Sequence, residues 1–520
     1  MKRRIQTALL AYLLLIACLC SGMTSCQNGD VPSETQSENM GELPPEEQII
    51  VKNSNPLQKY FMSNPLGVTG IGDPVVLYDN GMYYMYATSI GVGFKVWKTA
   101  NPSSWTSAGI AYQKSSTTFG EINYWAPEVY KHNGSYYLFY SALYKTASGK
   151  DRYAIGCAKA DSPEGPFVDI VPGKAIFAPD YSVIDANVLF DKSGKIYLYY
   201  SRDCSENVVN GKHTSQIWGV ELAPDFKSVI GEPVLLTTPD VTWELASGGT
   251  LWNEGPCVFE RNGIYYLMYS GGFYGNNTYS VGCAESDSPL GPFKKYKNNP
   301  VLKGDGKYVS GSGHNSYFMS PDGTEMYAVY HSHTNPAEGG GNRQLCIDKI
   351  TFDEDGKLSV NGPTFFSVPI PSGTAGVYTI QPDAFTLTAQ EGVKTQKGSA
   401  EEAANGILKA SVDRVSGDCW ILKPGDAGIR LDLKEPADLN YVALYGDPNH
   451  NSMPKSVTMV INGIYRIENV AFSDNFEPTL FSFRNLPDGV KVSSLTFYFT
   501  FEGDNDSVAI KEIIPVANAS

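Results

Sequence analysis

The chain has 520 residues, which exceeds the length at which a single hydrophobic core keeps growing, so at least two folded regions are expected. It contains 51 Gly and 33 Tyr and 18% charged residues, a composition typical of a turn-rich, strand-rich globular protein and not of a helical or disordered one. The formal net charge is -15, and Lys and Arg do not cluster beyond the first four positions, which argues against a nucleic acid as partner.

The N-terminus is predicted to be an export signal over residues 1–25. Basic residues precede an apolar run over residues 8–20 that is too short to cross a membrane as a stable helix. Small residues precede Cys26 and resemble a bacterial lipobox, so Cys26 is the predicted lipidation site, and Cys18 is the alternative. Both sites predict an exported protein anchored in the cell envelope, at the outer membrane or in the periplasm, which touches the membrane through its lipid alone.

Residues 26–58 are predicted to form a flexible tether. The stretch from Gln27 to Gln48 is rich in Ser, Glu, Asn and Pro and has almost no apolar residues, so it cannot bury enough surface to become ordered. A tether at this place would hold the folded body away from the lipid surface.

One pattern recurs five times between residues 59 and 372. Each copy is a strand, a tight turn with Gly and a Tyr-rich strand, which is typical of a β-hairpin. The turn glycines are 53, 60, 69 and 60 residues apart, which leaves room for about four short strands per copy. Four-stranded units repeated radially predict a five-bladed β-propeller, with a β-sandwich as the alternative. The five hairpins cover residues 75–88, 129–142, 188–202, 258–271 and 317–332.

Residues 373–520 follow a different pattern. Apolar and polar residues alternate in short runs, and these runs do not repeat one another. This alternation predicts a C-terminal β-sandwich of the jelly-roll type, so the whole chain is predicted to be all-β. The runs include residues 429–433, 441–444, 456–461 and 494–501.

The nine cysteines show neither the CxxC spacing nor the neighbouring histidines of a zinc site. Four of them lie inside apolar, strand-like runs, where a free cysteine usually behaves as a small buried hydrophobe. We therefore predict buried, unreactive thiols at Cys157, Cys257, Cys283 and Cys346.

Three acidic residues share one position of the repeat. We align the hairpins on the apolar residue that ends their first strand and look five residues earlier. That position opens the innermost strand of each blade, so its side chains are predicted to surround one end of the central channel. Neighbouring carboxylates raise one another's pKa values, a cost that structural need alone rarely explains. In chain order the position holds Asp73, Trp125, Asp185, Glu254 and His314.

This set of side chains meets the requirements of glycoside hydrolysis. One carboxylic acid protonates the leaving oxygen, and a second, ionised one activates water or attacks the anomeric carbon. A third acid can hold the pKa of the proton donor near the working pH. Trp125 offers a face on which a sugar ring stacks, and Asn253, beside Glu254, is predicted to contact the substrate as well.

Five short motifs together resemble glycoside hydrolase family 43. The resemblance covers about residues 60–370 and implies a five-bladed propeller that cleaves glycosidic bonds of arabinose, xylose or galactofuranose with inversion of configuration. It implies a polysaccharide or oligosaccharide as the partner and no cofactor for the chemistry, and we expect a monomer. The motifs are Asp73-Pro74, Trp125-Ala126-Pro127-Glu128, Ser182-Val183-Ile184-Asp185, Asn253-Glu254-Gly255-Pro256 and Gly313-His314-Asn315-Ser316.

The same resemblance implies roles for the acids. Asp73 is similar to the general base that activates water, and Glu254 to the general acid. Asp185 is similar to the residue that tunes the pKa of the acid and orients the sugar. Its neighbour Ala186 departs from the Pro or Gly that the family often has there.

Three further residues take expectations from the family. His314 resembles an axial histidine that sits beside a structural ion, commonly calcium, and contacts it through water. Arg343 resembles a late-blade arginine that often contacts the substrate. Glu128 stands where the motif commonly has Asp, and we expect it in the substrate pocket or in a structural role.

Other functions stay open at this level. A surface glycan-binding propeller without catalysis is one, although the presence of all three acids favours an enzyme. Fructan-cleaving propellers are another, but their motifs are absent from the required places. Long loops in blades three and four favour a deep pocket and attack on chain ends. The C-terminal region faintly resembles discoidin-like modules that bind galactose-type sugars, with a purely structural sandwich as the alternative.

Overall fold

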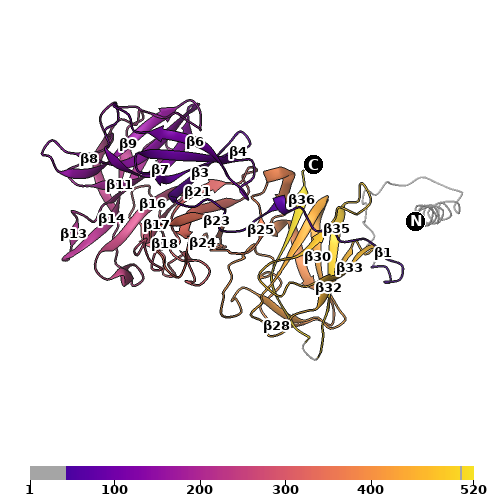
Figure 1. The fold of residues 1–520 in the computed structure, drawn as a ribbon. Helices are drawn as coiled ribbons and strands as arrows, with labels where there is room; N and C mark the ends of the chain where they lie inside the picture. The colour runs from indigo at the N-terminus through magenta and orange to yellow at the C-terminus, as the bar shows by residue number, and fades with distance from the viewer. Residues whose placement is uncertain (1–41, 504–505, 520) are drawn as a thin grey trace, which may run out of the picture. The chain divides into compact units, whose positions relative to one another are not determined.

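The computed structural model describes residues 42–503 and 506–519, and strands dominate them (Figure 1). The all-β prediction is confirmed, because the helices of these residues are four short 3-10 turns. None of the helices in this part of the chain has the length and apolar character that a membrane crossing requires. The predicted signal segment, both candidate lipidation cysteines and the tether up to residue 41 lie outside the described residues. The 3-10 turns are η1 (Gln58–Tyr60), η2 (Glu244–Ser247), η3 (Thr374–Gly376) and η4 (Pro382–Ala384).

Five antiparallel units, called sheets 1 to 5 here, follow one another along the chain. Sheet 1 contains β3 (Gly72–Asp79), β4 (Met82–Ile90), β5 (Gly93–Thr99) and β6 (Thr106–Gln113). Sheet 2 contains β7 (Ile122–His132), β8 (Ser135–Lys145), β9 (Asp151–Ala160) and β10 (Val168–Asp169). Sheet 3 contains β11 (Val183–Phe190), β12 (Ile196–Arg202), β14 (Lys212–Leu222) and β15 (Val229–Thr237), with β13 (Val208–Val209) on β14.

Sheets 4 and 5 continue the series. Sheet 4 contains β16 (Leu251–Arg261), β17 (Ile264–Gly271), β18 (Ser280–Ser286), β19 (Lys294–Lys295) and β20 (Leu302–Lys303). Sheet 5 contains β21 (Gly313–Met319), β22 (Met326–His333), β23 (Arg343–Phe352) and β24 (Leu358–Val360). A short parallel pairing of β14 with β16 joins sheets 3 and 4.

The five predicted hairpins are confirmed as the first two strands of the five sheets. The turn glycines have φ values between 74° and 86°, which only glycine adopts at little cost. In three of the turns an Asn with positive φ precedes the glycine, the sequence that a two-residue type I′ turn requires. The turn glycines are Gly81, Gly134, Gly194, Gly263 and Gly323.

The first strands of the sheets contact one another in cyclic order. Strand β3 contacts β7, β7 contacts β11, β11 contacts β16, β16 contacts β21, and β21 contacts β3 again. Tyr-rich cores fill the space between neighbouring sheets, and Cys157, Cys257, Cys283 and Cys346 are buried, as predicted, with free thiols. This order brings the starts of five strands, far apart in the sequence, to one place.

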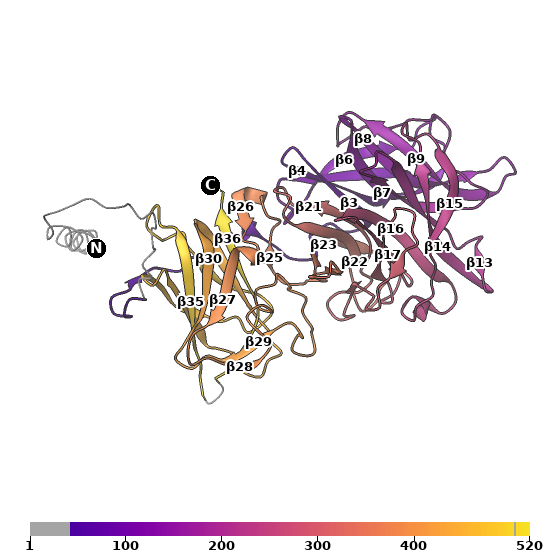
Figure 2. The same ribbon diagram turned by 180° about the vertical axis from the view of Figure 1, so that it is seen from behind.

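The C-terminal region has two sheets that share one hydrophobic core (Figure 2). One sheet has the order β1 (Ile49–Ile50), β33 (Tyr465–Ala471), β32 (Ser456–Ile461), β35 (Val492–Thr500), β30 (Ile429–Ala437) and β27 (Phe385–Ala389). The other has the order β28 (Lys394–Lys397), β29 (Trp420–Lys423), β36 (Val508–Asn518), β31 (Leu439–Gly446) and β34 (Thr479–Ser482), with β26 (Val377–Thr379) on β36. A small pair joins β2 (Phe61–Met62) to β25 (Val368–Pro369).

The end of the predicted tether is part of the fold, which corrects the predicted range 26–58. Strand β1 pairs in parallel with β33, and Val51 is buried in the C-terminal core. The physical reason is the apolar run Ile49-Ile50-Val51, which can bury surface as the polar stretch before it cannot. Residues 43–58 therefore belong to the folded body.

Candidate active site

Each first strand is interrupted by a β-bulge near its start. The pairing register skips at residues 72–75, 125–128, 184–187, 254–257 and 313–316. A bulge bends the strand and re-aims its side chains, so five bulges at one end of the five strands shape a common site. The residues that take positive φ there are Asp73 (55°), Ala126 (47°), Asp185 (59°), Gly255 (57°) and His314 (49°).

A cyclic set of hydrogen bonds, called the bulge ring here, links the five bulges. In every sheet the amide of the positive-φ residue donates to a side chain on the second strand of the preceding sheet. Four of the acceptors are Ser or Thr hydroxyls, and the fifth is a histidine nitrogen that closes the ring between sheets 5 and 1. The bonds are Ala126 to Thr88 (2.8 Å), Asp185 to Ser141 (2.9 Å), Gly255 to Ser201 (3.1 Å), His314 to Ser270 (2.7 Å) and Asp73 to His331 Nδ1 (3.1 Å).

The bulge ring corrects the predicted shared register. Asp73, Asp185 and His314 are themselves bulge residues, whereas Trp125 and Glu254 stand one position before the bulge. Counting back from the apolar end of the strand is wrong by one residue for these two. The reason is that Ala126 and Gly255 take the positive φ in sheets 2 and 4.

Asp73 is surrounded by hydrogen-bond donors and positive charge. Its Oδ2 accepts a hydrogen bond from the Thr88 hydroxyl at 2.7 Å, and its Oδ1 accepts one from Arg343 Nη1 at 3.1 Å. The Nδ1 of His314 lies 3.3 Å from the same Oδ1. Burial raises the pKa of Asp73, but the attraction of His314 and Arg343 outweighs it and holds the pKa well below its usual value. Asp73 is therefore ionised at neutral pH.

Glu254 has the opposite environment. Burial and the nearby charge of Asp185 raise the pKa of Glu254 well above its usual value. Burial also raises the pKa of Asp185, but its Oδ2 accepts hydrogen bonds from Ser201 Oγ at 2.9 Å and from the amide of Gly255 at 3.1 Å. Two donors stabilise the ionised form of Asp185, so the proton of this pair belongs on Glu254. The structure thus brings together one acid with a lowered pKa, Asp73, and one with a raised pKa, Glu254. The charge of the third acid, Asp185, contributes to the raised pKa of Glu254.

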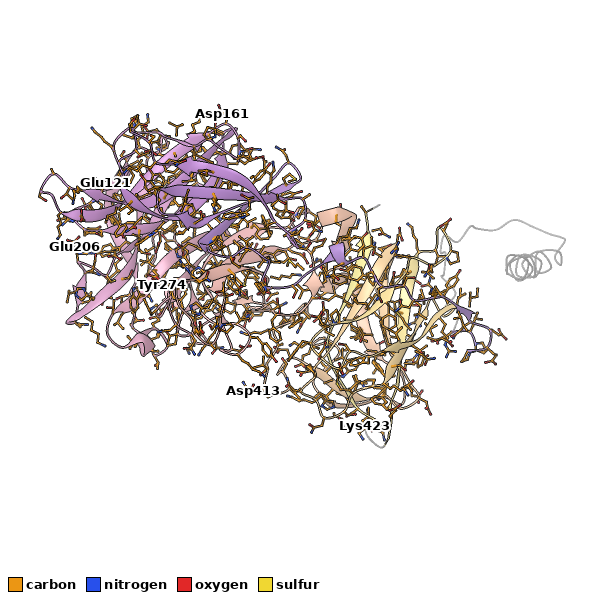
Figure 3. All side chains as sticks on the ribbon, in the orientation of Figure 1. Glu121, Asp161, Glu206, Tyr274, Asp413 and Lys423 are labelled. Atoms are coloured by element: carbon orange, nitrogen blue, oxygen red, sulfur yellow. The ribbon has the colours of Figure 1, made fainter. Side chains whose placement is uncertain are left out.

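Aromatic rings contact two of the predicted substrate-binding residues, Trp125 and Arg343. Trp125, whose face is predicted to stack on a sugar, lies parallel to Tyr153 with ring centroids 4.6 Å apart. The guanidinium of Arg343 lies over the ring of Tyr274, 5.2 Å from its centroid, and Tyr274 is exposed (Figure 3). Arg343 is thus held between Asp73 and an exposed aromatic ring, a position that suits contact with a bound ligand.

Two residues predicted to contact the substrate lie elsewhere. Asn253 is completely buried within sheet 4, where its Oδ1 accepts from Lys295 Nζ at 3.1 Å, because neighbouring residues of a strand point to opposite faces. Glu128 lies deeper among the first strands and lines a cavity of about 340 Å³ that all five of them border. Burial raises its pKa to about 8, and Tyr130, Ser316 and Asn187 hydrogen-bond to it. The expectation of a structural role fits Glu128 better than that of a substrate contact.

Comparison with known proteins identifies the family. Residues 62–358 match Glycosyl hydrolases family 43. The chain belongs to this family. It is 29% identical over 314 residues to "Beta-D-galactofuranosidase xynD" of Aspergillus niger, a match of 57% of this chain and 83% of that protein. It is 26% identical to "Extracellular endo-alpha-(1->5)-L-arabinanase 1" of Bacillus subtilis, over 58% of this chain and 91% of that protein.

Solved structures agree with this family. The chain is similar to a thermostable family-43 glycoside hydrolase, with 42% identity and a TM-score of 0.57 over 60% of this chain and 99% of the other. It is also similar to an endo-1,4-beta-xylanase of Bacteroides thetaiotaomicron, with 31% identity and a TM-score of 0.50 over 58% and 97% of the two chains. The family members differ in the sugar that their names give, so family 43 membership establishes a glycoside hydrolase and leaves the substrate open.

The residues around His314 do not form a direct calcium site. Within the residues that the structure describes, no group of three or more His, Cys, Asp or Glu side chains is placed to hold a metal ion. The His314 Nδ1 already faces Asp73, and Arg343 brings a positive charge to the same carboxylate. An ion that family 43 implies at this place would have to be held largely through water.

Sequence reasoning missed the side chains that support the acids. The acceptors of the bulge ring could have been found from the sequence, because each one stands directly after a Tyr or an Ala near the end of the second hairpin strand. Tyr279, whose hydroxyl lies 2.9 Å from Glu254 Oε1, left none, since it belongs to no repeated position. His331 and His333 are both fully buried, and His331 Nδ1 accepts a hydrogen bond from the Asp73 amide.

Proposed function

We propose that this family 43 member is an inverting glycosidase that removes arabinofuranosyl, xylosyl or galactofuranosyl residues from chain ends of a polysaccharide or oligosaccharide. The observation that carries the proposal is the contrast in one cluster between Asp73, which contacts Arg343 and His314 and has a lowered pKa, and the buried Glu254, which has a raised pKa. A hydrolase that works in one displacement needs an ionised base and a protonated acid at the same time. A glycan-binding protein without catalysis needs neither.

In the proposed reaction Asp73 accepts a proton from the water that attacks the anomeric carbon. Glu254 donates its proton to the glycosidic oxygen as the bond to the leaving sugar breaks. Asp185 keeps the proton on Glu254 until that moment, because a second negative charge beside Asp185 is unfavourable. Arg343 and Trp125 would hold the sugar, the first beside Asp73 and the second by stacking.

The same proposal covers architecture and location. The cyclic contacts of the five first strands support a closed five-bladed β-propeller, and the shared core of the two C-terminal sheets supports a β-sandwich. The N-terminal sequence supports export and a lipid at Cys26. Mass spectrometry of the N-terminal peptide of the protein isolated from cells tests the lipidation. An unmodified Cys26 would contradict it.

The role of each acid is tested with leaving groups of different quality. Glu254→Gln should lose at least about 100-fold in kcat/KM on glycosides with poor leaving groups and much less on activated aryl glycosides, which need little protonation. Asp73→Asn should fail on both, because every substrate needs the activated water. Equal losses of Glu254→Gln on both substrate types would contradict the assignment.

The sugar and the stereochemistry are read from the same assay. The protein without residues 1–26 is given aryl α-L-arabinofuranoside, β-D-xyloside and β-D-galactofuranoside, and NMR follows the anomer first released. Turnover with inversion supports the proposal, and retention overturns its mechanism. No turnover on any substrate, with glycan binding unchanged in Asp73→Asn, would favour the glycan-binding alternative.

A further inference from the structure

The hydroxyl of Tyr279 lies on the carboxyl of Glu254. It donates a hydrogen bond to Glu254 Oε1 at 2.9 Å, and the Tyr279 side chain is 1% exposed. In the part of the chain that the structure describes, the carboxyl of Glu254 forms no other hydrogen bond. Tyr279 therefore engages one carboxyl oxygen and leaves the other, Oε2, free for proton transfer.

A chain of hydrogen bonds fixes the direction of this contact. The amide of His314 donates to Ser270 Oγ at 2.7 Å, and a backbone N–H can only donate. The proton of Ser270 is then free for the neighbouring Tyr279 hydroxyl, with which Ser270 interacts. The remaining proton, that of Tyr279, then points to Glu254. Such chains polarise each member, which strengthens the last donor.

Packing holds the Tyr279 ring in place. Its ring lies parallel to the imidazole of His331, with centroids 5.6 Å apart and an interplanar angle of 7°. On its other side it fills the space beside Gly313, where an added Cβ would stand 2.3 Å from two ring carbons. The same imidazole accepts the amide of Asp73. One stacked pair thus connects the supports of both Glu254 and Asp73.

We propose that Tyr279 is a positioning residue for the acid step. This inference rests on the proposed role of Glu254 and adds a residue that controls it. Tyr279 keeps the transferable proton on Oε2 by occupying Oε1. As that proton leaves, negative charge develops on Glu254, and the hydrogen bond from Tyr279 becomes charge-assisted and stronger. Tyr279 therefore stabilises the transition state more than the ground state.

If Tyr279 positions the acid, the loss of kcat in Tyr279→Phe should depend on the leaving group. We expect kcat to fall about 10- to 100-fold on glycosides with poor leaving groups, the value of one hydrogen bond to a developing charge. On activated aryl glycosides, where little charge develops on Glu254, we expect a loss of less than about 3-fold, with KM little changed. A purely structural role would reduce both rates equally.

The titration of Glu254 gives a readout that needs no turnover. Tyr279 favours the ionised carboxyl, so its removal should raise the pKa of Glu254 further and move the basic limb of kcat/KM to higher pH. NMR of protein with ¹³C-labelled glutamate measures the pKa directly, with Glu254→Gln to assign the signal. This measurement tests the role of Tyr279 separately from the proposed glycosidase activity, because the pKa of Glu254 can be measured even if the wild type hydrolyses none of the tested glycosides.

Two further variants complete the test. Tyr269→Phe is the matched control: its buried hydroxyl, on β17, also donates to a carboxylate, Glu244 Oε1 of η2 at 2.7 Å, outside the site. Gly313→Ala keeps the Tyr279 hydroxyl but displaces its ring, so it should reproduce the loss of Tyr279→Phe if that variant fails to fold. Equal losses on both leaving groups, or an unchanged pKa of Glu254 in both Tyr279→Phe and Gly313→Ala, would overturn the proposal.

Discussion

At the scale of single residues, the neighbours of Asp73 and Glu254 account for the opposite shifts of their pKa values, since both side chains are buried. Burial raises the pKa of both Asp73 and Glu254. Asp73 faces His314, Arg343 and a hydroxyl, which lower its pKa, whereas Glu254 faces other carboxyls, which add to the rise that burial causes. Two carboxyls in one site thereby take the two ionisation states that acid–base chemistry needs.

Gly72 gives this arrangement a single-residue test. A Cβ on Gly72 would stand 2.2 Å from Arg343 Nη2, so Gly72→Ala should push the guanidinium away from Asp73. The pKa of Asp73 is depressed in the folded protein, and loss of the cation should raise it. The acid limb of kcat/KM should therefore move to higher pH, with about a 10-fold loss of activity on all aryl glycosides.

Gly91→Ala is the control for this change, because a Cβ at Gly91 meets no atom within 4 Å. The pH–rate profile of that variant should match the wild type. An acid limb that stays in place in Gly72→Ala would show that Arg343 does not govern the ionisation of Asp73.

At the scale of elements, the bulge ring holds the site together. Its bonds cross from one sheet to the next and join the start of each first strand to the second strand of its neighbour. A buried amide without a partner is unfavourable, so each hydroxyl fixes both the bulge and the side chain it carries. The acids are thus placed by contacts between sheets and not by the strands alone.

Ser141→Ala tests one bond of the ring. Ser141 is fully buried and accepts the amide of Asp185, which the variant leaves unpaired. We expect the free energy of unfolding to fall by about 1–3 kcal/mol in urea titrations. Ser107→Ala, an exposed strand residue of sheet 1, should change it by less than about 0.5 kcal/mol. Equal free energies of unfolding of the two variants would show that this bond of the bulge ring does not stabilise the fold.

The elements also show what sequence reasoning can reach. The hairpins were predictable because Gly turns and Tyr-rich strands are local signals, repeated five times, and three of the turns are Asn-Gly. The bulge was not, since the residue that takes positive φ depends on the contact of each sheet with its neighbour. That is why Trp125 and Glu254 were placed one residue off, although the acids themselves were found. Asn253 was misplaced because a motif shows adjacency along the chain but not the face of the strand, and for Glu128 the motif left both a pocket and a structural role open.

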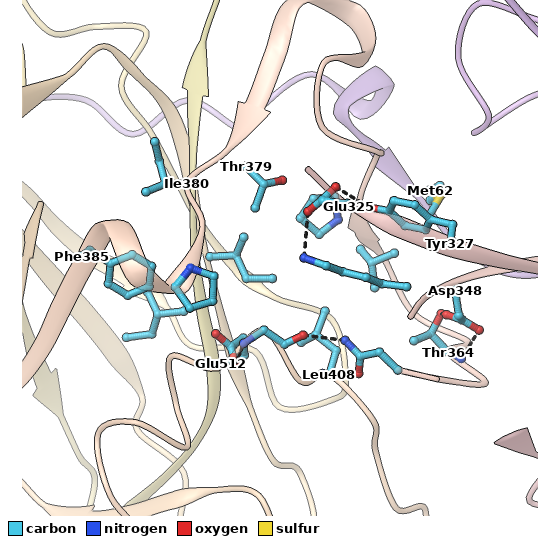
Figure 4. A pocket seen from close by; sticks show the side chains of 18 residues that line it. Met62, Glu325, Tyr327, Asp348, Thr364, Thr379, Ile380, Phe385, Leu408 and Glu512 are labelled. Carbon is cyan, nitrogen blue, oxygen red and sulfur yellow. Dashed lines mark hydrogen bonds and ion pairs between the residues drawn. The ribbon is translucent and has the colours of Figure 1, made fainter. Parts of the chain in front are cut away.

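At the scale of the whole folded body, residues 43–519 contain an interface that buries ionisable groups. Tyr441 and Tyr445 of β31 pack in one core with Phe61 and Phe366, so the C-terminal sheets and the five-sheet region share apolar contacts. A cavity of about 50 Å³ lies beside this core, and Glu512 and the ion pair of Glu325 with Lys349 line it (Figure 4). A buried carboxyl at such a place makes stability depend on pH.

Glu512→Gln should remove part of the pH dependence of the free energy of unfolding. Burial raises the pKa of Glu512 from 4.5 to about 8, while its Oε2 accepts the amide of Gly406 at 3.0 Å. A raised pKa favours the protonated folded state, so its stabilising effect is complete below about pH 4.5 and is lost as the pH rises to about 8. The glutamine keeps an acceptor for Gly406 and cannot ionise. In urea titrations from pH 5 to 9, the variant should therefore gain about 3–5 kcal/mol on the wild type as the pH rises. Glu502→Gln, at an exposed residue, should keep the slope of the wild type, and the same slope in Glu512→Gln would mean that Glu512 is ionised in the folded protein.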